Sequence, residues 1–214
     1  MMKYKLIIFD CDGTLVDSEP VSNKVVSDMI NELGIPMTPE KSIALFAGTQ
    51  FSNIVNYIHR FQPEVSAQNF EGQFRERSKV AFEKFLTPIA GVVDFIESLD
   101  IPYCVASNGP RLKMETTLSV TNLKAYFGGN IFSAYDIESW KPEPDLFLYA
   151  AEKMGFKAEE TLVIEDTISG LDAAVNAEMD CAIFSDNGSV SEFEGKAKYI
   201  FNHFNELPSV LDRI

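Results

Sequence analysis

Two aspartates separated by a single residue follow a short apolar run near the start of the chain. The stretch LIIFDCDGT places Asp10 and Asp12 directly after four apolar residues. Residues two apart in an extended chain point to the same side, so both carboxylates should face one crevice. There they repel each other unless a cation or a shared proton lies nearby. An acidic turn or a helix cap would use the same residue types, so this pair alone leaves chemistry and local structure as alternatives.

Three further groups of polar residues stand at the end of an apolar run or beside a proline. The stretch YCVASNG ends close to Ser107 and Asn108, which can hold an anion together with main-chain N–H groups or cap the next helix. The stretch WKPEP constrains Lys141 tightly, although an exposed charge is the usual role of a lysine. The stretch TLVIEDT contains Glu165 and Asp166, of which Asp166 could equally cap a helix. Each group taken alone therefore has an ordinary structural explanation.

Taken together, the four groups provide what the hydrolysis of a phosphate ester requires. Enzymes accelerate this very slow reaction by up to about 10²¹-fold, which corresponds to roughly 28 kcal/mol. A nucleophile, an acid and base, a cation and fixed donors to the phosphoryl oxygens can jointly supply such an acceleration. The chain has a net charge of −14, so a bound cation would also help it to accept an anionic substrate.

Short apolar runs alternate with stretches of helical spacing, which predicts an α/β fold with a parallel sheet covered on both faces. The expected strands are residues 5–9, 103–107, 131–134, 161–165, 181–184 and 199–201. The expected helices between them are residues 91–99, 111–123, 144–154 and 168–177. Ligands of such sheets bind at the carboxyl ends of the strands, where Asp10, Ser107 and Glu165 are expected.

The segment from about residue 20 to residue 86 interrupts this alternation, because it has helical spacing throughout and no evident strand. The helices expected there are residues 21–33, 39–46, 50–61 and 68–85, between linkers at residues 16–20 and 87–91. A block of this size after the first strand predicts an inserted all-α domain. We therefore expect one domain formed by residues 1–16 and 88–214, and a helical domain formed by residues 17–87.

The composition excludes several classes of protein and partner. With 46% hydrophobic residues the chain can bury a core, and its acidic balance argues against nucleic acid or an anionic membrane as partner. No apolar run is long enough to span a membrane, and no signal peptide is evident, so we expect a cytoplasmic protein. Cys11, Cys104 and Cys181 lie in or beside apolar runs and are expected to be small buried residues. The default expectation for the oligomeric state is a monomer.

The four stretches IFDCDGTLVDSEP, VASNGP, WKPEPD and VIEDTISG, in this order, resemble the motifs of haloacid dehalogenase-like (HAD) phosphohydrolases with a helical cap. The resemblance extends to about Asp186 and is to the branch of phosphoglycolate phosphatases and β-phosphoglucomutases. Within that branch, the residues of these motifs are most similar to those of the bacterial 6-phosphogluconate phosphatases. The resemblance implies a Rossmann-like parallel sheet core, in which the helical insert is a cap over the site.

The resemblance also implies catalytic roles. Asp10 would be the nucleophile that forms an aspartyl phosphate, and Asp12 would be the general acid and then the general base. Ser107 and the backbone around Asn108 would hold phosphoryl oxygens. Lys141 would pair with both Asp10 and the phosphoryl group and offset their charge.

A magnesium ion is the cofactor that the resemblance implies. Its ligands would be a carboxylate oxygen of Asp10, the main-chain carbonyl of Asp12, Asp166 and water, with Glu165 close by or behind them. These are the oxygen ligands that Mg²⁺ prefers, and the substrate phosphate would complete the set.

Two other functions use the same fold and must be compared with hydrolysis. β-Phosphoglucomutases carry a histidine where this chain has Ser22 and a cap arginine where it has Phe51, so both departures favour a phosphatase. A catalytically idle sugar-phosphate sensor would lack the nucleophile or the acid, whereas Asp10 and Asp12 are both present.

The identity of the substrate depends on the cap in this family. The cap residues expected to contact the leaving group are Glu19, Gly48, Thr49 and Gln50. We expect a small phosphate ester, either a sugar phosphate or a sugar-acid phosphate.

Overall fold

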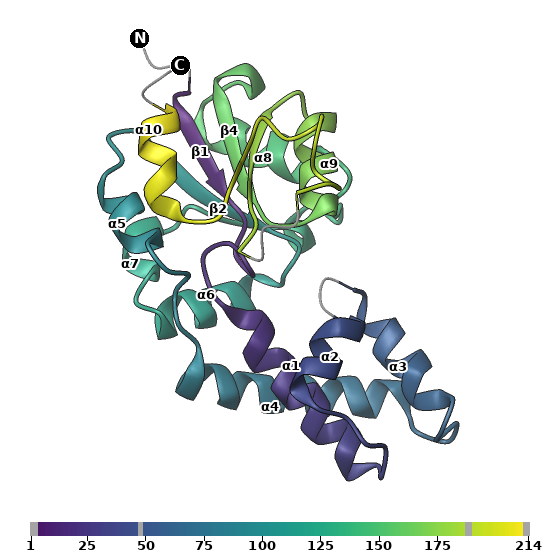
Figure 1. Cartoon of the computed structure of the whole chain (residues 1–214). Helices are drawn as coiled ribbons and strands as arrows, with labels where there is room; N and C mark the ends of the chain where they lie inside the picture. Colours follow the sequence, from purple (N-terminus) through teal and green to yellow (C-terminus); the bar gives the residue numbers. More distant parts are fainter. Residues whose placement is uncertain (1–3, 47–48, 187–189, 212–214) are drawn as a thin grey trace. The chain divides into compact units, whose positions relative to one another are not determined.

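The computed structural model describes residues 4–46, 49–186 and 190–211 of the 214-residue chain (Figure 1). The chain folds into two compact units. Residues 1–16 and 88–214 form the first, named here the core unit, and residues 17–87 form the second, named the helical unit. Each unit is described by itself.

The core unit contains a parallel sheet of six strands in the order β3-β2-β1-β4-β5-β6 (Figure 1). The strands are β1 Leu6–Phe9, β2 Tyr103–Ser107, β3 Ile131–Ser133, β4 Thr161–Glu165, β5 Asp180–Phe184 and β6 Tyr199–Phe201. All neighbouring pairs are parallel, and β1 lies between β2 and β4. The expected α/β fold class is confirmed, and the expected strands are found within one residue of their predicted ends.

Helices join the strands and cover both faces of the sheet (Figure 1). The α-helices of the core unit are α5 Val92–Glu97, α6 Arg111–Val120, α7 Lys124–Phe127, α8 Asp145–Met154, α9 Ile168–Asn176 and α10 Leu207–Leu211. Three short 3₁₀ helices are Ala134–Asp136, Ala158–Glu160 and Phe204–Glu206. The helix expected over residues 111–123 is found as α6 but ends three residues earlier, because Asn122 adopts a left-handed φ of 61° just after it.

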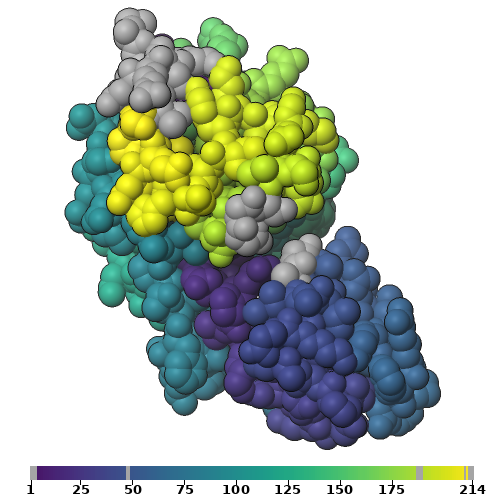
Figure 2. All heavy atoms as spheres, in the orientation of Figure 1, coloured from purple at the N-terminus to yellow at the C-terminus, as the bar shows by residue number. Residues whose placement is uncertain are grey.

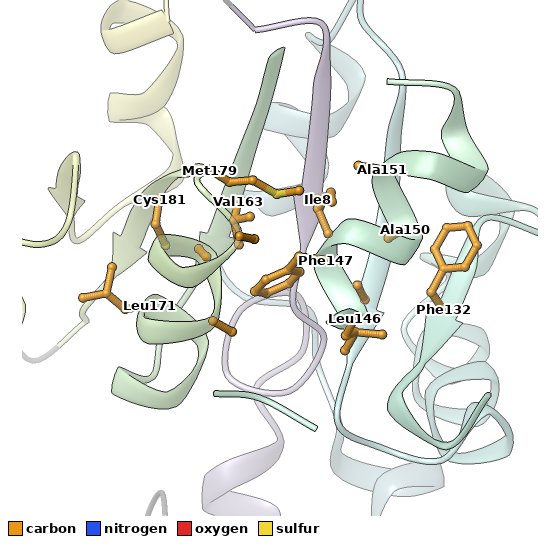
Figure 3. Packing of buried hydrophobic residues seen from close by; sticks show 14 of the residues in the cluster. Ile8, Phe132, Leu146, Phe147, Ala150, Ala151, Val163, Leu171, Met179 and Cys181 are labelled. Atoms are coloured by element: carbon orange, nitrogen blue, oxygen red, sulfur yellow. The ribbon is translucent and has the colours of Figure 1, made fainter. Parts of the chain in front are cut away.

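One face of the sheet packs against α8 and α9, and this packing forms the larger part of the core (Figure 3). Ile8 of β1 and Val163 of β4 are fully buried there, against Phe147 of α8 and Leu171 of α9. Alternate residues of β1 point to the opposite face, where the ring of Phe9 packs edge-on against aromatic rings of α5 and α7. Burial of each such side chain contributes roughly 1.5–3 kcal/mol, and strands buried on both faces read as continuous apolar runs.

The surface of the core unit includes its C-terminal segments, coloured yellow in Figure 2. Cys11, Cys104 and Cys181 are buried and carry free thiols, as expected. Within the described ranges, no helix combines the length and apolar character that crossing a membrane would need.

The helical unit contains four α-helices, as expected. They are α1 Ser18–Glu32, α2 Pro39–Phe46, α3 Phe51–His59 and α4 Ala67–Phe85. Their buried faces share a separate apolar cluster, which includes Ile30 of α1, Ile58 of α3 and Phe70 of α4. The linker expected at residues 16–20 was partly wrong: α1 already begins at Ser18, because a proline is tolerated in the first turn of a helix.

Candidate active site

The site lies at the carboxyl ends of three adjacent strands of the core unit. Asp10 follows β1, Ser107 ends β2 and Glu165 ends β4, so the strand order brings these residues to one edge of the sheet. The main-chain N–H of Asp10 donates to the carbonyl of Ile164 at 2.9 Å, which extends the ladder by one residue beyond β1. All three side chains are buried. The expectation that these residues lie together is met by this geometry.

Lys141 forms the centre of the site. Its ammonium group donates to Asp10 Oδ1 at 2.5 Å, to Glu165 Oε1 at 2.7 Å and to the carbonyl of Ala106 at 3.0 Å. The Lys141 side chain is only 3% exposed, and its nitrogen lies 4.8 Å from the centre of the Phe147 ring. An exposed lysine, the alternative in the sequence, is therefore excluded. All three N–H donors have protein acceptors, so a contact with a phosphoryl oxygen requires the release of one of them.

Glu165 joins Lys141 to the loop that carries Asp166. Its second oxygen, Oε2, accepts hydrogen bonds of 2.9 Å from the main-chain N–H groups of Asp166 and Thr167 and from the Thr167 hydroxyl. Both carboxylate oxygens of Glu165 thus bind protein donors, and this arrangement favours a supporting role over direct contact with a metal. A Cβ at Gly170 would lie 1.9 Å from the Glu165 carboxyl group, so glycine is required at that position.

The Asp166 carboxylate lies against the loop that follows β1. Asp166 Oδ1 accepts a hydrogen bond of 3.0 Å from the Thr14 hydroxyl. Gly13, with a φ of +81°, allows this approach, because a Cβ there would lie 2.2 Å from Asp166 Oδ2. The hydroxyl of Thr167 accepts a hydrogen bond from the N–H of Gly170 and caps α9. The alternative in which Asp166 caps this helix is therefore wrong.

Burial and neighbouring negative charge raise the pKa values of two carboxyl groups in the site, those of Asp10 and Asp166. Burial is the largest cause that raises the pKa of Asp10 to about 7, and the charges of Glu165 and Asp12 add to it, whereas Lys141 opposes it. Burial, followed by the charges of Glu165 and Asp10, raises the pKa of Asp166 well above its usual range. One lysine thus does not balance the negative charge at this end of the sheet.

This excess of negative charge fits a divalent cation. In the part of the chain that the structure describes, no group of three or more His, Cys, Asp or Glu side chains is arranged to share a metal ion. The ligand set expected from the sequence needs only two side chains, those of Asp10 and Asp166, because its third protein ligand is the main-chain carbonyl of Asp12. The carboxylate oxygens of buried Asp10 and partly buried Asp166 suit a hard ion such as Mg²⁺.

The loop after β2 is held by hydrogen bonds within the loop and to Ser133 and Lys141. The N–H of Gly109 donates to the Ser107 hydroxyl at 3.3 Å, and the Ser133 hydroxyl donates to the carbonyl of Gly109 at 2.8 Å. The Asn108 side chain accepts from the N–H of Lys141 at 2.9 Å and donates to the Lys141 carbonyl at 3.4 Å. Asn108 therefore positions the backbone that carries Lys141, a role that the sequence did not indicate. The N-cap of α6 is Pro110, so neither Ser107 nor Asn108 caps that helix.

Asp12 contacts a residue that the sequence analysis did not identify. Lys113, in α6, donates from its ammonium group to Asp12 Oδ2 at 2.6 Å. The available signal was its position one turn into the helix that follows the stretch VASNGP.

The residues expected to contact the leaving group belong to the helical unit. Glu19 lies in the first turn of α1, and Gln50 is the N-cap residue of α3. The Thr49 hydroxyl donates to the carbonyl of Phe46 at 2.9 Å. Gly48 lies outside the described residues. Their expected role in substrate binding stays a prediction.

Comparison with known proteins identifies the family. The model of the haloacid dehalogenase-like hydrolases matches residues 7–184. The 6-phosphogluconate phosphatase of Escherichia coli K12 is 31% identical over 212 residues, which cover 98% of this chain and 96% of that protein. The phosphorylated carbohydrates phosphatase of Thermotoga maritima is 26% identical over 174 residues, and the match covers 80% of each chain.

A solved structure supports the same assignment. The crystal structure of a conserved haloacid dehalogenase-like protein of unknown function from Agrobacterium tumefaciens C58 is similar with a TM-score of 0.87. The two chains are 28% identical, and the similarity covers 98% of each. The chain therefore belongs to the haloacid dehalogenase-like hydrolase family and is one of its phosphatases, as its four motifs predicted.

Proposed function

We propose that the protein is a Mg²⁺-dependent phosphatase that hydrolyses a small sugar phosphate or sugar-acid phosphate through an aspartyl phosphate. The observation that carries the proposal is the pairing of buried Asp10 with buried Lys141 at the carboxyl end of the central strand β1. Asp12 lies two residues further along; Ser107 ends β2 and Asp166 follows β4, the strands on either side of β1.

The reaction has two steps. In the first, an Asp10 oxygen attacks phosphorus, the bond from phosphorus to the ester oxygen breaks, and Asp12 gives that oxygen its proton. In the second, Asp12 takes a proton from water as the water oxygen attacks phosphorus. The aspartyl bond then breaks, which releases inorganic phosphate and restores both carboxyl groups.

Fixed charges and donors support both steps. Lys141 holds the attacking carboxylate in place, and Ser107 with the backbone near it would hold phosphoryl oxygens. Mg²⁺, held by Asp10, the main-chain carbonyl of Asp12 and Asp166, would supply the positive charge that the transferred group requires.

The substrate class is inferred from the named relatives. One is a 6-phosphogluconate phosphatase and another a phosphorylated carbohydrates phosphatase, so phosphorylated sugars and sugar acids are the class to test. Cytoplasmic location and a monomeric state stay predictions.

A screen of sugar phosphates and sugar-acid phosphates tests the proposal, with phosphate release measured in Mg²⁺ and in EDTA. We expect release only with Mg²⁺, and none from Asp10→Asn. The matched control is Asp172→Asn, which removes a partly exposed carboxylate paired with Lys196 in the same unit. Hydrolysis by Asp10→Asn at the wild-type rate would refute the assignment of the nucleophile. Isomerisation of glucose 1-phosphate faster than phosphate release would replace the phosphatase with a mutase.

A further inference from the structure

The carboxylate of Asp12 is held from one side by a lysine that no motif contains. Lys113 Nζ lies 2.6 Å from Asp12 Oδ2, although the two residues are 101 positions apart in the chain. The side chains are 39% and 27% exposed, so the contact is partly accessible to solvent.

The backbone that carries Lys113 is firmly fixed. Its N–H donates to the carbonyl of Pro110 at 2.9 Å, and its carbonyl accepts from the Thr117 hydroxyl at 3.2 Å. The first residue of the helix, Arg111, pairs with Asp136 at 2.6 Å. A long side chain that extends from such a base has a limited set of positions, so it can orient the group to which it binds.

Lys113 also lies beside the loop expected to hold phosphate. A Cβ placed on Gly109 would lie 3.8 Å from each of three atoms, namely Asp12 Oδ2, Lys113 Cδ and Ser107 Oγ. The lysine stem, the acid and the serine hydroxyl therefore surround one point next to the loop. A surface ion pair with no further role would not need to be at this point.

We propose that Lys113 is a positioning residue that binds Asp12 Oδ2 and thereby directs Oδ1 toward the oxygen of the departing alcohol. This inference rests on the proposed function, in which Asp12 protonates that oxygen. A partly exposed ion pair contributes little to stability, so the benefit of Lys113 would be in orientation. Orientation of an acid matters most where the leaving oxygen is most basic, because such an oxygen cannot depart without a proton.

The test compares three esters whose leaving oxygens are increasingly basic: p-nitrophenyl phosphate, phenyl phosphate and 6-phosphogluconate. For each, kcat/KM reports transfer to Asp10 alone, because the later attack by water follows the first irreversible step. For Lys113→Met we expect a loss of about 10–100-fold on 6-phosphogluconate, which is part of the 10²–10⁴-fold that general acid catalysis provides. The loss should be smaller on phenyl phosphate and at most about threefold on p-nitrophenyl phosphate, whose leaving group needs no proton.

Two variants serve as controls. Lys113→Arg keeps a cationic donor at this position and should retain most of the wild-type activity on 6-phosphogluconate, which Lys113→Met loses. Lys124→Met removes a comparably exposed lysine, paired with Glu115 at 3.8 Å, and should leave all three rates unchanged.

The outcomes separate this inference from the proposed function. Equal losses on all three esters would place Lys113 on the phosphoryl group and overturn the positioning role, as would the absence of any loss. A wild-type protein that releases no phosphate from these three esters or from any sugar phosphate of the screen would overturn the proposed function, and the role of Lys113 with it.

Discussion

Two aspartates of the first motif, Asp10 and Asp12, lie two residues apart, and each pairs with a lysine. The surroundings of the two pairs differ sharply. The Lys141–Asp10 pair has side chains that are 3% and 9% exposed, and its lysine also binds Glu165. The Lys113–Asp12 pair has side chains that are 39% and 27% exposed.

The difference follows from the elements that supply the lysines. Lys141 comes from the loop before α8 and reaches into the sheet edge, whereas Lys113 comes from the outer part of the site, on α6. A nucleophile must hold one position, which a buried network enforces. An acid that exchanges protons with an alcohol and with water must be reachable by both, and the Asp12 side chain is 27% exposed although its Oδ1 is buried. One motif thus places two identical side chains in environments suited to different tasks.

Lys141→Met should produce the largest effect, because it leaves two buried carboxylates without their cation. We expect the free energy of unfolding to fall by about 3–5 kcal/mol. The turnover number should fall on the order of 10³-fold or more, because an electrostatic contact to the reacting group is lost. Denaturant unfolding and phosphate release measure the two effects. Lys153→Met, which removes a lysine above the Tyr149 ring on the exposed side of α8, is the control and should change both only slightly. Retention of activity within tenfold of wild type would show that the buried pair is not required.

Gly170→Ala tests the support behind the buried pair without a change of charge. The new methyl group would overlap the Glu165 carboxyl group, which holds Lys141, so Glu165 must move. We expect destabilisation by about 1–3 kcal/mol together with loss of activity. Gly72→Ala is the matched control: Gly72 lies in α4 with no atom within 4 Å of an added Cβ, so alanine there should stabilise by about 0.5–1 kcal/mol. Equal effects of the two substitutions on thermal unfolding would contradict the close contact.

Asp166→Asn tests the excess negative charge around the buried pair. Folding raises the pKa values of Asp10 and Asp166, so the folded protein binds these protons more tightly than the unfolded chain. Their contribution therefore favours folding at low pH and is lost as the pH rises, for Asp10 between about pH 4 and pH 7. In EDTA at pH 7.5, Asp166→Asn should therefore be more stable than wild type, by about 0.5–2 kcal/mol.

The same variant separates the charge effect from metal binding. The stability gain should shrink at pH 5, where more of the wild-type carboxyl groups are protonated. Mg²⁺ should raise the melting temperature of wild type but not that of Asp166→Asn. A lower melting temperature for the variant in EDTA at pH 7.5 would refute an unfavourable charge at this position.

Much of the fold could be predicted because β1 and β4 are buried on both faces and read as unbroken apolar runs. The parallel order then places every strand end at one edge. The boundaries that differed depend on single residues: Asn122 adopts a left-handed conformation, and Pro20 lies inside a first turn where it resembled a linker. Such positions carry no periodic signal.

The site was predictable where backbone direction alone decides the position, as for Asp10 and Ser107 at strand ends. It was not predictable where a side chain bridges distant segments. Asn108 binds the backbone of Lys141, and Lys113 binds Asp12 from a helix on which several positions could hold an exposed lysine. Gly170 gave no signal either, since its requirement arises only when Glu165 folds against it.

The smallest expected effect concerns the contribution of the partly exposed Lys113–Asp12 pair to stability. Lys113→Met should change the free energy of unfolding by less than about 1 kcal/mol, because partly exposed pairs gain little over hydration. A double-mutant cycle with Asp12→Asn should give a coupling energy of about 0.2–1 kcal/mol, several times smaller than the loss expected for Lys141→Met. Denaturant unfolding in EDTA measures this coupling without catalysis. A coupling above about 3 kcal/mol would show that both pairs hold the fold together, and the division between a fixed nucleophile and an accessible acid would then be wrong.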